Sequence, residues 1–344
     1  MNIIKKHILL LGLLLIFVVF SVFVSSAKAP GSSYKITLAQ YQTGPEFPCY
    51  RIAEYFVQKV DELSDGRITI DHFPGDLLGG WETQEVSVKE GSLDMCQAPA
   101  SSIFDPEIEF VRLPYVVFSW EGAKNVYGPG KDGEKLIEEI CGRNNTYCLG
   151  VQPEGFLVSV STKKFTPLPG DDSIKKIKTR VPGVKIEEIT GKTLGFSTLS
   201  MSFGEIHSAL MLGTIDAAIG PSYGEAPLFK DVVKYMYKYN YVFAAAPWII
   251  NLDLWNSLPE EDQEILRTAM TEAIAIEWDI GRKTEEEAIA KMQEAGVEVV
   301  DLTTEQMAAN VEACRNKVWS WAAENIYKKE FLNTVLSFAE ELPD

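Results

Sequence analysis

Residues 257–295 read SLPEEDQEILRTAMTEAIAIEWDIGRKTEEEAIAKMQEA, and this stretch decides the architecture that we expect. Ser257 can cap a helix, Pro259 suits a first helical turn, and the acids that follow favour the positive end of the helix dipole. Helical periodicity continues from there until Gly296. A helix of about 36 residues is roughly 54 Å long, which exceeds one domain of this size. We therefore predict a helix that braces two domains, with a possible kink at Gly281.

The rest of the chain alternates segments typical of strands with segments typical of helices. We predict strands at 34–40, 67–72, 93–98, 110–117, 147–151, 157–161 and 296–302. We predict further helices at 48–63, 81–89, 121–127, 133–140 and 303–327. A second alternating run covers 175–241. Such alternation indicates an α/β fold with largely parallel sheets.

The first residues of the chain are typical of a secretory signal. Lysines at positions 5 and 6 precede an uncharged, mostly apolar run at 8–24, and Ala27-Lys28-Ala29 forms a small-x-small cleavage site. We expect a signal peptide at 1–29 that is cleaved, and hence a periplasmic protein. The apolar run is slightly long for a signal and slightly short for a spanning helix, so a retained N-terminal anchor is the alternative.

The charge of the chain excludes some partners. The formal net charge is -17, and removing residues 1–29 takes away three lysines and no acid, which gives -20. So acidic a surface disfavours nucleic acid and anionic membranes. An anionic ligand would have to be held by a local positive site. The remaining length is enough for two domains.

Cysteine and histidine give little support for a metal site or a cofactor, and we expect neither. The five cysteines form no CxxC motif; they are Cys49, Cys96, Cys141, Cys148 and Cys314. Cys141 and Cys148 are the best candidates for a disulfide, since export permits one. Five free, mostly buried thiols are the alternative. Only His72 and His207 follow the predicted signal.

One arginine stands out as a candidate ligand-binding residue. The stretch 178–183 reads KTRVPG, so Arg180 ends a predicted strand just before a turn, and SFGE follows at 202–205. A guanidinium offers two parallel donors to a carboxylate. This placement predicts capture of a carboxylate. The alternative is a structural arginine that pairs with an acid such as Glu187.

Several fragments, in order, resemble one known family. They are YKITLAQYQTGPEFPCYRIAEYF, LGGWE at 78–82, GSLD at 91–94, RVPG, FGEIHSALMLGTIDAAIG and INLDLWNSLPEEDQEIL. The chain resembles the extracytoplasmic solute-binding proteins of TRAP transporters, of the dicarboxylate-binder (DctP-like) type. The resemblance covers essentially the whole mature chain, and the order and spacing of the fragments carry it.

The resemblance implies a layout and a function. It implies two domains joined by crossing strands and a long helix, at 34–156 plus 246–285 and at 157–245 plus 286–338. It also implies that a small organic acid binds in the cleft, that the domains close over it, and that the protein delivers it to TRAP membrane permease subunits. We expect a monomer.

The resemblance also implies which residues face the ligand. Arg180 would hold the carboxylate, and Phe203 would pack on the ligand unless it is only a core aromatic. Trp81 would offer a stacking face, unless it is simply half-buried at a helix start. The other candidates are Gln42, Gln97, Ser101, Ser102, Gly220, Tyr223 and Trp248.

Two departures from the family pattern bear on the ligand. Leu157 stands where many members carry a second arginine, and Gly220 stands where many carry an asparagine. Losing a cation and an amide disfavours a sugar acid or a dicarboxylate. It favours a monocarboxylate with an apolar or aromatic body.

Two rival functions stay open at this stage. An exported hydrolase could act on a carboxylate in the same cleft, but it would need an activated nucleophile or a positioned acid and base. His207 lacks an evident orienting partner, and we expect a structural role for it. A membrane-tethered ligand sensor would follow if the signal were retained. The GxGxxG match at 128–133 follows a helix, so we read it as a turn.

Overall fold

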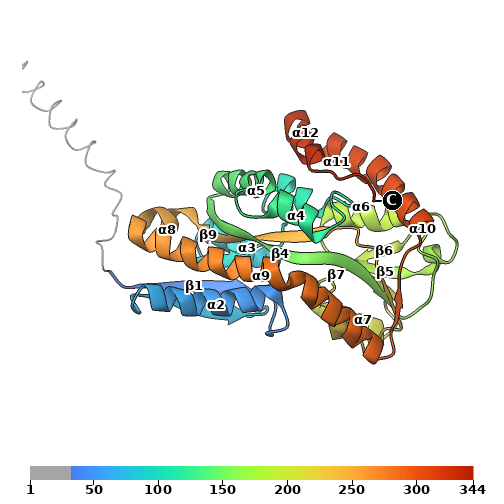
Figure 1. Cartoon of the computed structure of the whole chain (residues 1–344), viewed down its shortest axis with the longest axis horizontal. Helices are drawn as coiled ribbons and strands as arrows, with labels where there is room; N and C mark the ends of the chain where they lie inside the picture. The colour runs from blue at the N-terminus through green and yellow to red at the C-terminus, as the bar shows by residue number, and fades with distance from the viewer. Residues whose placement is uncertain (1–31, 344) are drawn as a thin grey trace, which may run out of the picture.

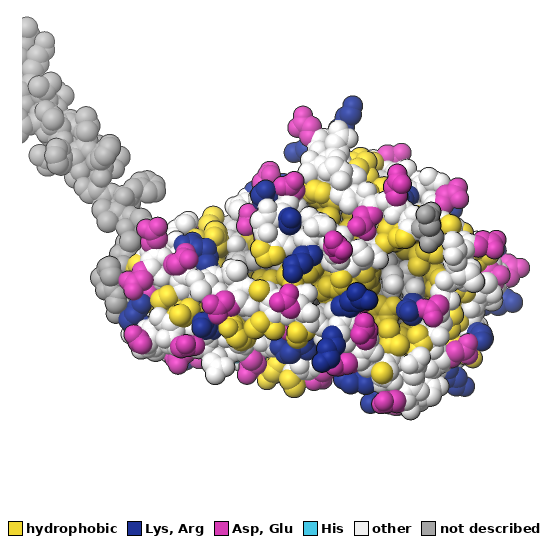
Figure 2. All heavy atoms as spheres, viewed as in Figure 1, with side chains coloured by type: hydrophobic (Ala, Val, Ile, Leu, Met, Phe, Trp, Pro, Cys, Tyr) yellow, Lys and Arg dark blue, Asp and Glu magenta, His cyan; other side chains and the backbone are white. Residues whose placement is uncertain are grey.

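The computed structural model describes residues 32–343 (Figure 1). The predicted signal peptide at 1–29 lies outside the described residues. Among the helices that are described, none is long and apolar enough to cross a membrane. Figure 2 shows acidic and basic side chains interspersed over one face of the molecule, with apolar side chains visible between them.

The first part of the sheet has the strand order β2–β1–β3–β9–β4. These strands are Ile68–Pro74, Tyr34–Gln40, Met95–Gln97, Phe243–Asn251 and Thr146–Ser161. β1 runs parallel to β2 and β3, whereas β9 runs antiparallel to β3 and β4. The helices of this part are α2 (Pro48–Leu63), α3 (Trp81–Glu90), α4 (Trp120–Tyr127), α5 (Asp132–Arg143) and α8 (Leu252–Ser257).

The second part of the sheet continues from β4 in the order β4–β7–β5–β6. On the other side of β4, β8 pairs with β4 and β10 pairs with β8. These strands are β7 (Ala217–Ser222), β5 (Lys178–Val181), β6 (Ser197–Ser200), β8 (Tyr235–Tyr237) and β10 (Glu298–Val300). The helices are α6 (Lys185–Leu194), α7 (Ile206–Met211), α10 (Thr304–Cys314), α11 (Ser320–Asn325) and α12 (Lys329–Ser337). Short 3-10 segments are η1 (Pro106–Arg112), η2 (Ile174–Lys176), η3 (Phe203–Glu205) and η4 (Ala226–Phe229), and η5 (Arg315–Trp319) is a π-helical segment that continues α10 into α11.

A single long strand, β4, connects the two parts. It pairs with β9 as far as Phe156 and with β7 from Leu157 onward. Its register shifts between Pro153 and Gly155, where Gly155 has a φ of 91°. The two strands that we predicted at 147–151 and 157–161 are therefore one continuous strand. The predicted α/β fold is confirmed.

The long helix is confirmed as α9 (Glu260–Glu294), which runs along both parts and changes direction partway (Figure 1). Ser257 is not its cap, because α8 ends at Ser257 and its Oγ donates to the Leu254 carbonyl at 2.7 Å. Helix α9 continues through Gly281. A Cβ at Gly281 would lie 2.2 Å from a ring carbon of Trp120, so this glycine lets α4 approach α9 closely.

The strand predicted at 110–117 is wrong. Its first residues, 110–112, are instead the end of η1, whose first turn is capped by the Asp105 side chain accepting from the Glu107 amide at 2.9 Å. Pro106 sits where its missing N–H costs nothing. An apolar run alone does not distinguish a strand from another buried segment.

All five cysteines are free and buried, which is the alternative that we had left open, and the structure does not contain the candidate Cys141–Cys148 disulfide. The two thiols are nevertheless close: a hydrogen bond to Cys141, together with burial, raises the pKa of the Cys148 thiol. Oxidation of this pair after export remains a prediction.

Candidate functional site: a cavity with two buried arginines

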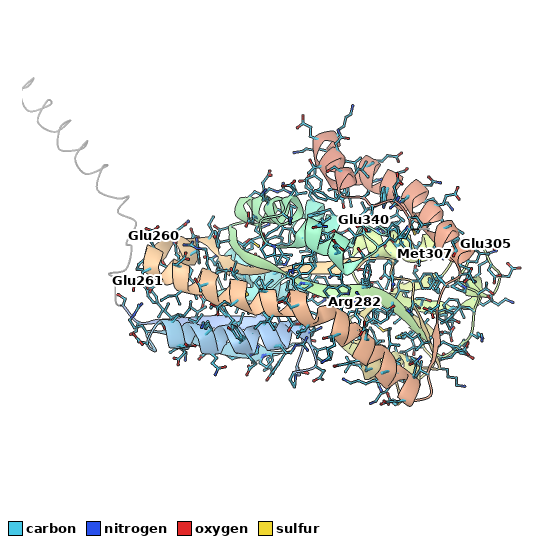
Figure 3. All side chains as sticks on the ribbon, in the orientation of Figure 1. Glu260, Glu261, Arg282, Glu305, Met307 and Glu340 are labelled. Atoms are coloured by element: carbon cyan, nitrogen blue, oxygen red, sulfur yellow. The ribbon has the colours of Figure 1, made fainter. Side chains whose placement is uncertain are left out.

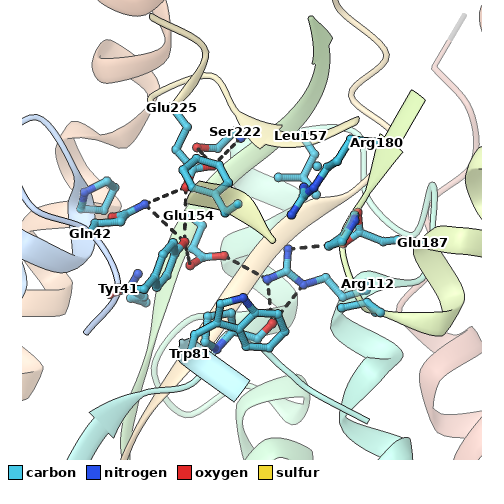
Figure 4. Close-up of a pocket in the computed structure, with 17 residues that line it drawn as sticks. Tyr41, Gln42, Trp81, Arg112, Glu154, Leu157, Arg180, Glu187, Ser222 and Glu225 are labelled. Atoms are coloured by element: carbon cyan, nitrogen blue, oxygen red, sulfur yellow. Dashed lines mark hydrogen bonds and ion pairs between the residues drawn. The ribbon is translucent and has the colours of Figure 1, made fainter. Parts of the chain in front are cut away.

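A cavity lies where the two parts of the sheet meet (Figure 4). It holds about 590 Å³ of empty space, part of which opens to solvent. Its walls come from the loop after β1, the start of α3, the crossing strand β4, and β5, α6 and β7. Segments far apart in the sequence therefore supply one site.

Arg180, near the end of β5, is the residue whose positive charge has no ion-pair partner among the described residues. Only 3% of it is exposed. Its Nε donates to the Met201 carbonyl at 2.9 Å and its Nη1 to the Ile219 carbonyl at 3.3 Å. Within residues 32–343, its Nη2 donates no hydrogen bond, and no carboxylate oxygen lies within 4.0 Å of its nitrogens. Burial lowers the pKa of Arg180, although nearby Glu187 counteracts this.

Such an arrangement is suited to binding an anion. A buried cation without a charged partner has lost its hydration, and an anion with hydrogen-bond acceptors restores what was lost. The alternative that Arg180 pairs structurally with Glu187 is not what the structure has. The Glu187 carboxylate instead accepts from the Tyr241 hydroxyl at 2.8 Å and lies 3.7 Å from Arg112.

Arg112 is a second buried arginine in the cavity, and the sequence analysis missed it. It ends η1, and its Nη2 donates to the Pro99 carbonyl at 2.7 Å and to Glu154 at 3.3 Å. Burial acts to lower the pKa of Arg112, but the charges of Glu154 and Glu187 outweigh it and raise the pKa. Unlike Arg180, Arg112 is already neutralised by the protein. An arginine inside an apolar run was the available clue.

Two more glutamates line the cavity on the side of Tyr41. The Glu154 Oε1 accepts from Gln97 at 2.9 Å and faces the Tyr41 hydroxyl at 3.3 Å. The Glu225 Oε1 accepts from Gln42 at 2.8 Å and faces the same hydroxyl at 3.3 Å. Burial raises the pKa of Glu225, and the charge of Glu154 raises it further. Neither acid had been singled out from the sequence, since Glu154 lies within β4 and Glu225 follows β7, and only the fold brings these two strands together.

Apolar side chains supply the rest of the walls. Trp81, Phe203, Tyr41 and Leu157 line the cavity. The Phe203 ring meets Tyr41 edge-on with centroids 6.3 Å apart, and the Arg180 guanidinium lies 6.0 Å from its centroid. The predicted residues Phe203 and Trp81 are therefore cavity residues in the structure.

Gly220 also lines the cavity, as predicted, and its lack of a side chain has a clear reason. Its φ is 104°, and a Cβ there would lie 3.1 Å from the Arg180 Nη1 and 3.3 Å from a Glu187 oxygen. A side chain at this position would compete with Arg180 for space. Gln42 is the remaining predicted residue that reaches the cavity.

Five predicted residues lie outside the lining of the cavity: Gln97, Ser101, Ser102, Tyr223 and Trp248. Gln97 donates a hydrogen bond to Glu154, which does line the cavity. Trp248 is fully buried in β9 and donates to Gln152 at 2.8 Å. The Tyr223 hydroxyl donates to Asn240 at 2.8 Å.

The two serines are turned toward other partners. The Ser101 Oγ accepts from the Ile103 amide at 3.1 Å, and the Ser102 side chain hydrogen-bonds Glu109. Correspondence with a family places backbone segments, but it does not decide which way each side chain points.

Neither histidine chemistry nor a metal cluster is evident in the described part of the chain. His207 does have a partner, contrary to what the sequence indicated, since its Nε2 lies 3.0 Å from Asp231, but it lies outside the cavity. Within residues 32–343, no group of three or more histidine, cysteine or acidic residues could hold a metal ion.

Similar proteins share this architecture. The chain is 26% identical to the C4-dicarboxylate-binding periplasmic protein DctP of Rhodobacter capsulatus over 271 residues, 77% of this chain and 80% of that protein. It is 27% identical to a monocarboxylate 2-oxoacid-binding periplasmic protein of Nostoc over 267 residues, 75% of this chain and 71% of that protein. These proteins cover most of the described residues.

Solved structures agree with the fold. A TRAP periplasmic solute-binding protein from Desulfovibrio desulfuricans, with bound sn-glycerol-3-phosphate, superposes with a TM-score of 0.82 at 21% identity, covering 90% of this chain and 99% of that one. The sugar acid binding protein DctPAm from Advenella mimigardefordensis, in complex with galactonate, gives 0.81 at 23% identity, with coverage of 89% and 98%. The predicted two-domain binding-protein fold is thus confirmed.

The family assignment rests on a match along most of the chain. The profile described as "Bacterial extracellular solute-binding protein, family 7" (DctP) matches residues 39–325. Together with the TRAP solute-binding proteins above, this confirms the resemblance seen in the sequence. The chain belongs to the bacterial extracellular solute-binding proteins of family 7.

Proposed function

We propose that this protein captures a monocarboxylate with an apolar or aromatic body in the cavity between its domains, and delivers it to the membrane permease of a TRAP transporter. The observation that carries the proposal is the Arg180 guanidinium, which is buried and has no anionic partner among the described residues. Relatives named for a C4-dicarboxylate, for galactonate and for a 2-oxoacid all take organic acids.

The balance of charges supports one carboxylate rather than two. Of the two arginines, Arg112 is engaged by Glu154 and Glu187, which leaves only Arg180 free. A second carboxylate on the ligand would meet glutamates instead of a cation. Arg112 lines the same cavity as Leu157, but its charge is already balanced by these two acids.

The energy of such a contact is adequate for a transport protein. A hydrogen bond to a charged group contributes about 1.5–3 kcal/mol. Two such bonds from Arg180 would supply a large part of the roughly 8 kcal/mol behind micromolar affinity. The walls formed by Trp81, Phe203 and Leu157 would add burial of an apolar body at roughly 25 cal/mol per Å².

The proposed cycle uses the two domains at 34–156 plus 246–285 and at 157–245 plus 286–338. The change of partner along β4 at Phe156 and Leu157 supports a boundary there. The ligand would favour the closed arrangement only to the extent that it binds that arrangement more tightly. We propose an exported monomer whose signal is cleaved after residue 29, which N-terminal sequencing would test.

A melting-temperature screen tests the ligand class. Purified protein is mixed with matched mono- and dicarboxylates of equal chain length, together with branched and aromatic monocarboxylates. We expect the branched or aromatic monocarboxylates to raise the melting temperature and the dicarboxylates to leave it unchanged. The reverse pattern would contradict the proposal. Prolonged incubation with the best ligand, followed by mass spectrometry, should return it unchanged; a product would favour the hydrolase instead.

A further inference from the structure

The charges that line the cavity do not match a simple carboxylate. Two arginines and three glutamates line it, which gives a formal charge of -1 when all are ionised. A monocarboxylate would bring the total to -2 inside a largely desolvated space. Arg180 would gain a partner, but the excess of acid would increase. The lining therefore calls for positive charge as well as negative charge on the ligand.

Of the three glutamates that line the cavity, Glu225 is the one without an ion pair to an arginine in the described part of the chain. It is 5% exposed, and no lysine, arginine or histidine nitrogen lies within 4.0 Å of it among residues 32–343. Its Oε2 accepts from the backbone amide of Ser222 at 2.8 Å and from the Ser222 hydroxyl at 3.2 Å. Its Oε1 accepts from Gln42 and faces Tyr41. All of these donors are neutral, so they hold the carboxyl in place without balancing a charge.

The Tyr41 hydroxyl is shared between the two acids on this side of the cavity. Its hydroxyl lies 3.3 Å from Oε1 of Glu154 and 3.3 Å from Oε1 of Glu225 (Figure 4). A tyrosine hydroxyl has one hydrogen, so it donates to only one of the two at a time. At any time one of the two oxygens therefore has only its amide donor, Gln97 for Glu154 or Gln42 for Glu225. An ammonium group has three donors and would serve both oxygens.

The two unbalanced groups face one cavity. Glu225 and Arg180 both line the same cavity, and they are near enough for the Glu225 charge to act on Arg180, yet they are more than 4.0 Å from a direct ion pair. Each is at least nine-tenths buried. One ligand that carries both a negative and a positive group would neutralise both.

We propose that the solute is an amino acid or a related zwitterion with an apolar or aromatic side chain. Its carboxylate is held by Arg180, and its ammonium group is held by Glu225 together with Glu154. The proposal rests on the proposed function and makes it more specific, since it adds a cationic group to the monocarboxylate. The apolar side chain packs against Trp81 and Phe203.

The experiment compares matched ligands. Isothermal titration calorimetry measures binding of apolar and aromatic amino acids, and of the 2-hydroxy, 2-oxo and unsubstituted acids that carry the same side chains. We expect the tightest binder to be an amino acid, and its matched acids to bind at least tenfold more weakly. Glu225→Gln should weaken the amino acid at least tenfold and leave the matched acids unchanged or tighter. Glu286→Gln, an exposed glutamate on α9, is the matched control and should change neither.

The other outcomes separate the inference from the function. If a matched acid binds as tightly as its amino acid, or if Glu225→Gln weakens both equally, the zwitterion is wrong while the organic-acid function stands. If a hydroxy or oxo acid binds tightly only with added Na⁺ or Ca²⁺, Glu225 holds a metal cation instead, and the inference is equally wrong. Binding of no acid from either set would contradict the proposed function itself.

Discussion

Arg180 is a cation that the fold buries without neutralising. Two backbone carbonyls, of Met201 and Ile219, fix the guanidinium and leave Nη2 for a ligand. Burying an unpaired charge costs free energy. An anion that pairs with Arg180 recovers this cost, which strengthens its binding. The neighbouring glycine, Gly220, keeps the guanidinium in place by giving it room.

Gly220→Ala should therefore harm both stability and binding. A φ of 104° is strained for a residue with a Cβ, which costs about 1–3 kcal/mol, and the Cβ would press on Arg180. We expect a lower melting temperature and at least a tenfold weaker affinity, measured by calorimetry. Gly130→Ala is the matched control: it also has a positive φ, but a Cβ there meets nothing within 4 Å. Normal affinity in Gly220→Ala would show that Arg180 does not need this space.

Local sequence was enough to single out two of the residues that line the cavity. Arg180 could be found because it ends a strand before a turn, and Phe203 because it follows at a helix start. Arg112, Glu154 and Glu225 could not, since they meet only after β4, η1 and η4 have been brought together. Their chemistry depends on pairing between distant segments, which a single sequence does not display.

Helix α9 and strand β4 are joined by one carboxyl group at the crossing. The Glu285 Oε2 accepts from the Trp120 indole at 2.9 Å, and its Oε1 accepts from the Phe156 amide at 2.8 Å. Phe156 is where β4 leaves β9. Burial raises the pKa of Glu285 to about 7, while the bond from Trp120 lowers it.

This raised pKa predicts a pH dependence of stability. The folded state binds the Glu285 proton more tightly than the unfolded state does, so this contribution is fully present below pH 4.5 and is lost as pH rises through about 7. The loss is at most about 3 kcal/mol, and solvent reduces it because the side chain is only partly buried. We expect Glu285→Gln to flatten the unfolding free energy between pH 4.5 and 8, as followed by urea denaturation.

The matched control for that experiment is Glu286→Gln. Glu286 is next in the helix and 66% exposed, so it should keep the pH dependence of the wild type. Equal pH dependence in the wild type and in Glu285→Gln would show that Glu285 titrates normally.

The long elements were the most predictable parts of the fold. Helix α9 and the strand at 34–40 carry sustained periodicity, which a sequence displays directly. The start of α9 was misplaced, because Ser257 serves the end of α8 instead. The segment at 110–117 was misassigned because its apolar residues are buried on all sides, which removes any period.

The whole molecule is a pair of domains that share β4 and α9, and the cavity lies between them. Figure 3 shows α9 along this length, with Glu260 and Glu261 at its beginning and Arg282 farther along. Hydrogen bonds within the protein also cross the proposed boundary between the two domains. Glu109, in η1, accepts from the amides of Lys185 and Ile186 at the start of α6, at 3.2 and 3.1 Å.

Glu109→Ala should therefore loosen the closed arrangement. It would leave the Lys185 and Ile186 amides without this acceptor, and for the buried Ile186 amide the cost is about 1–3 kcal/mol. We expect a larger radius of gyration in ligand-free protein by small-angle scattering, and affinity weakened by about tenfold. Glu107→Ala is the control, since Glu107 lies in the same 3-10 segment but pairs with Arg143. Identical scattering and affinity in Glu109→Ala would remove this contact from domain closure.

The most direct test of the account is the affinity of Arg180→Ala. Calorimetry with the best ligand from the screen should give a dissociation constant at least tenfold higher than in the wild type. The melting temperature of the ligand-free variant should be unchanged or raised, because a buried unpaired charge has been removed. Arg282→Ala, which alters an arginine that is 79% exposed, should bind normally. An unchanged dissociation constant in a folded Arg180→Ala protein would contradict the central claim.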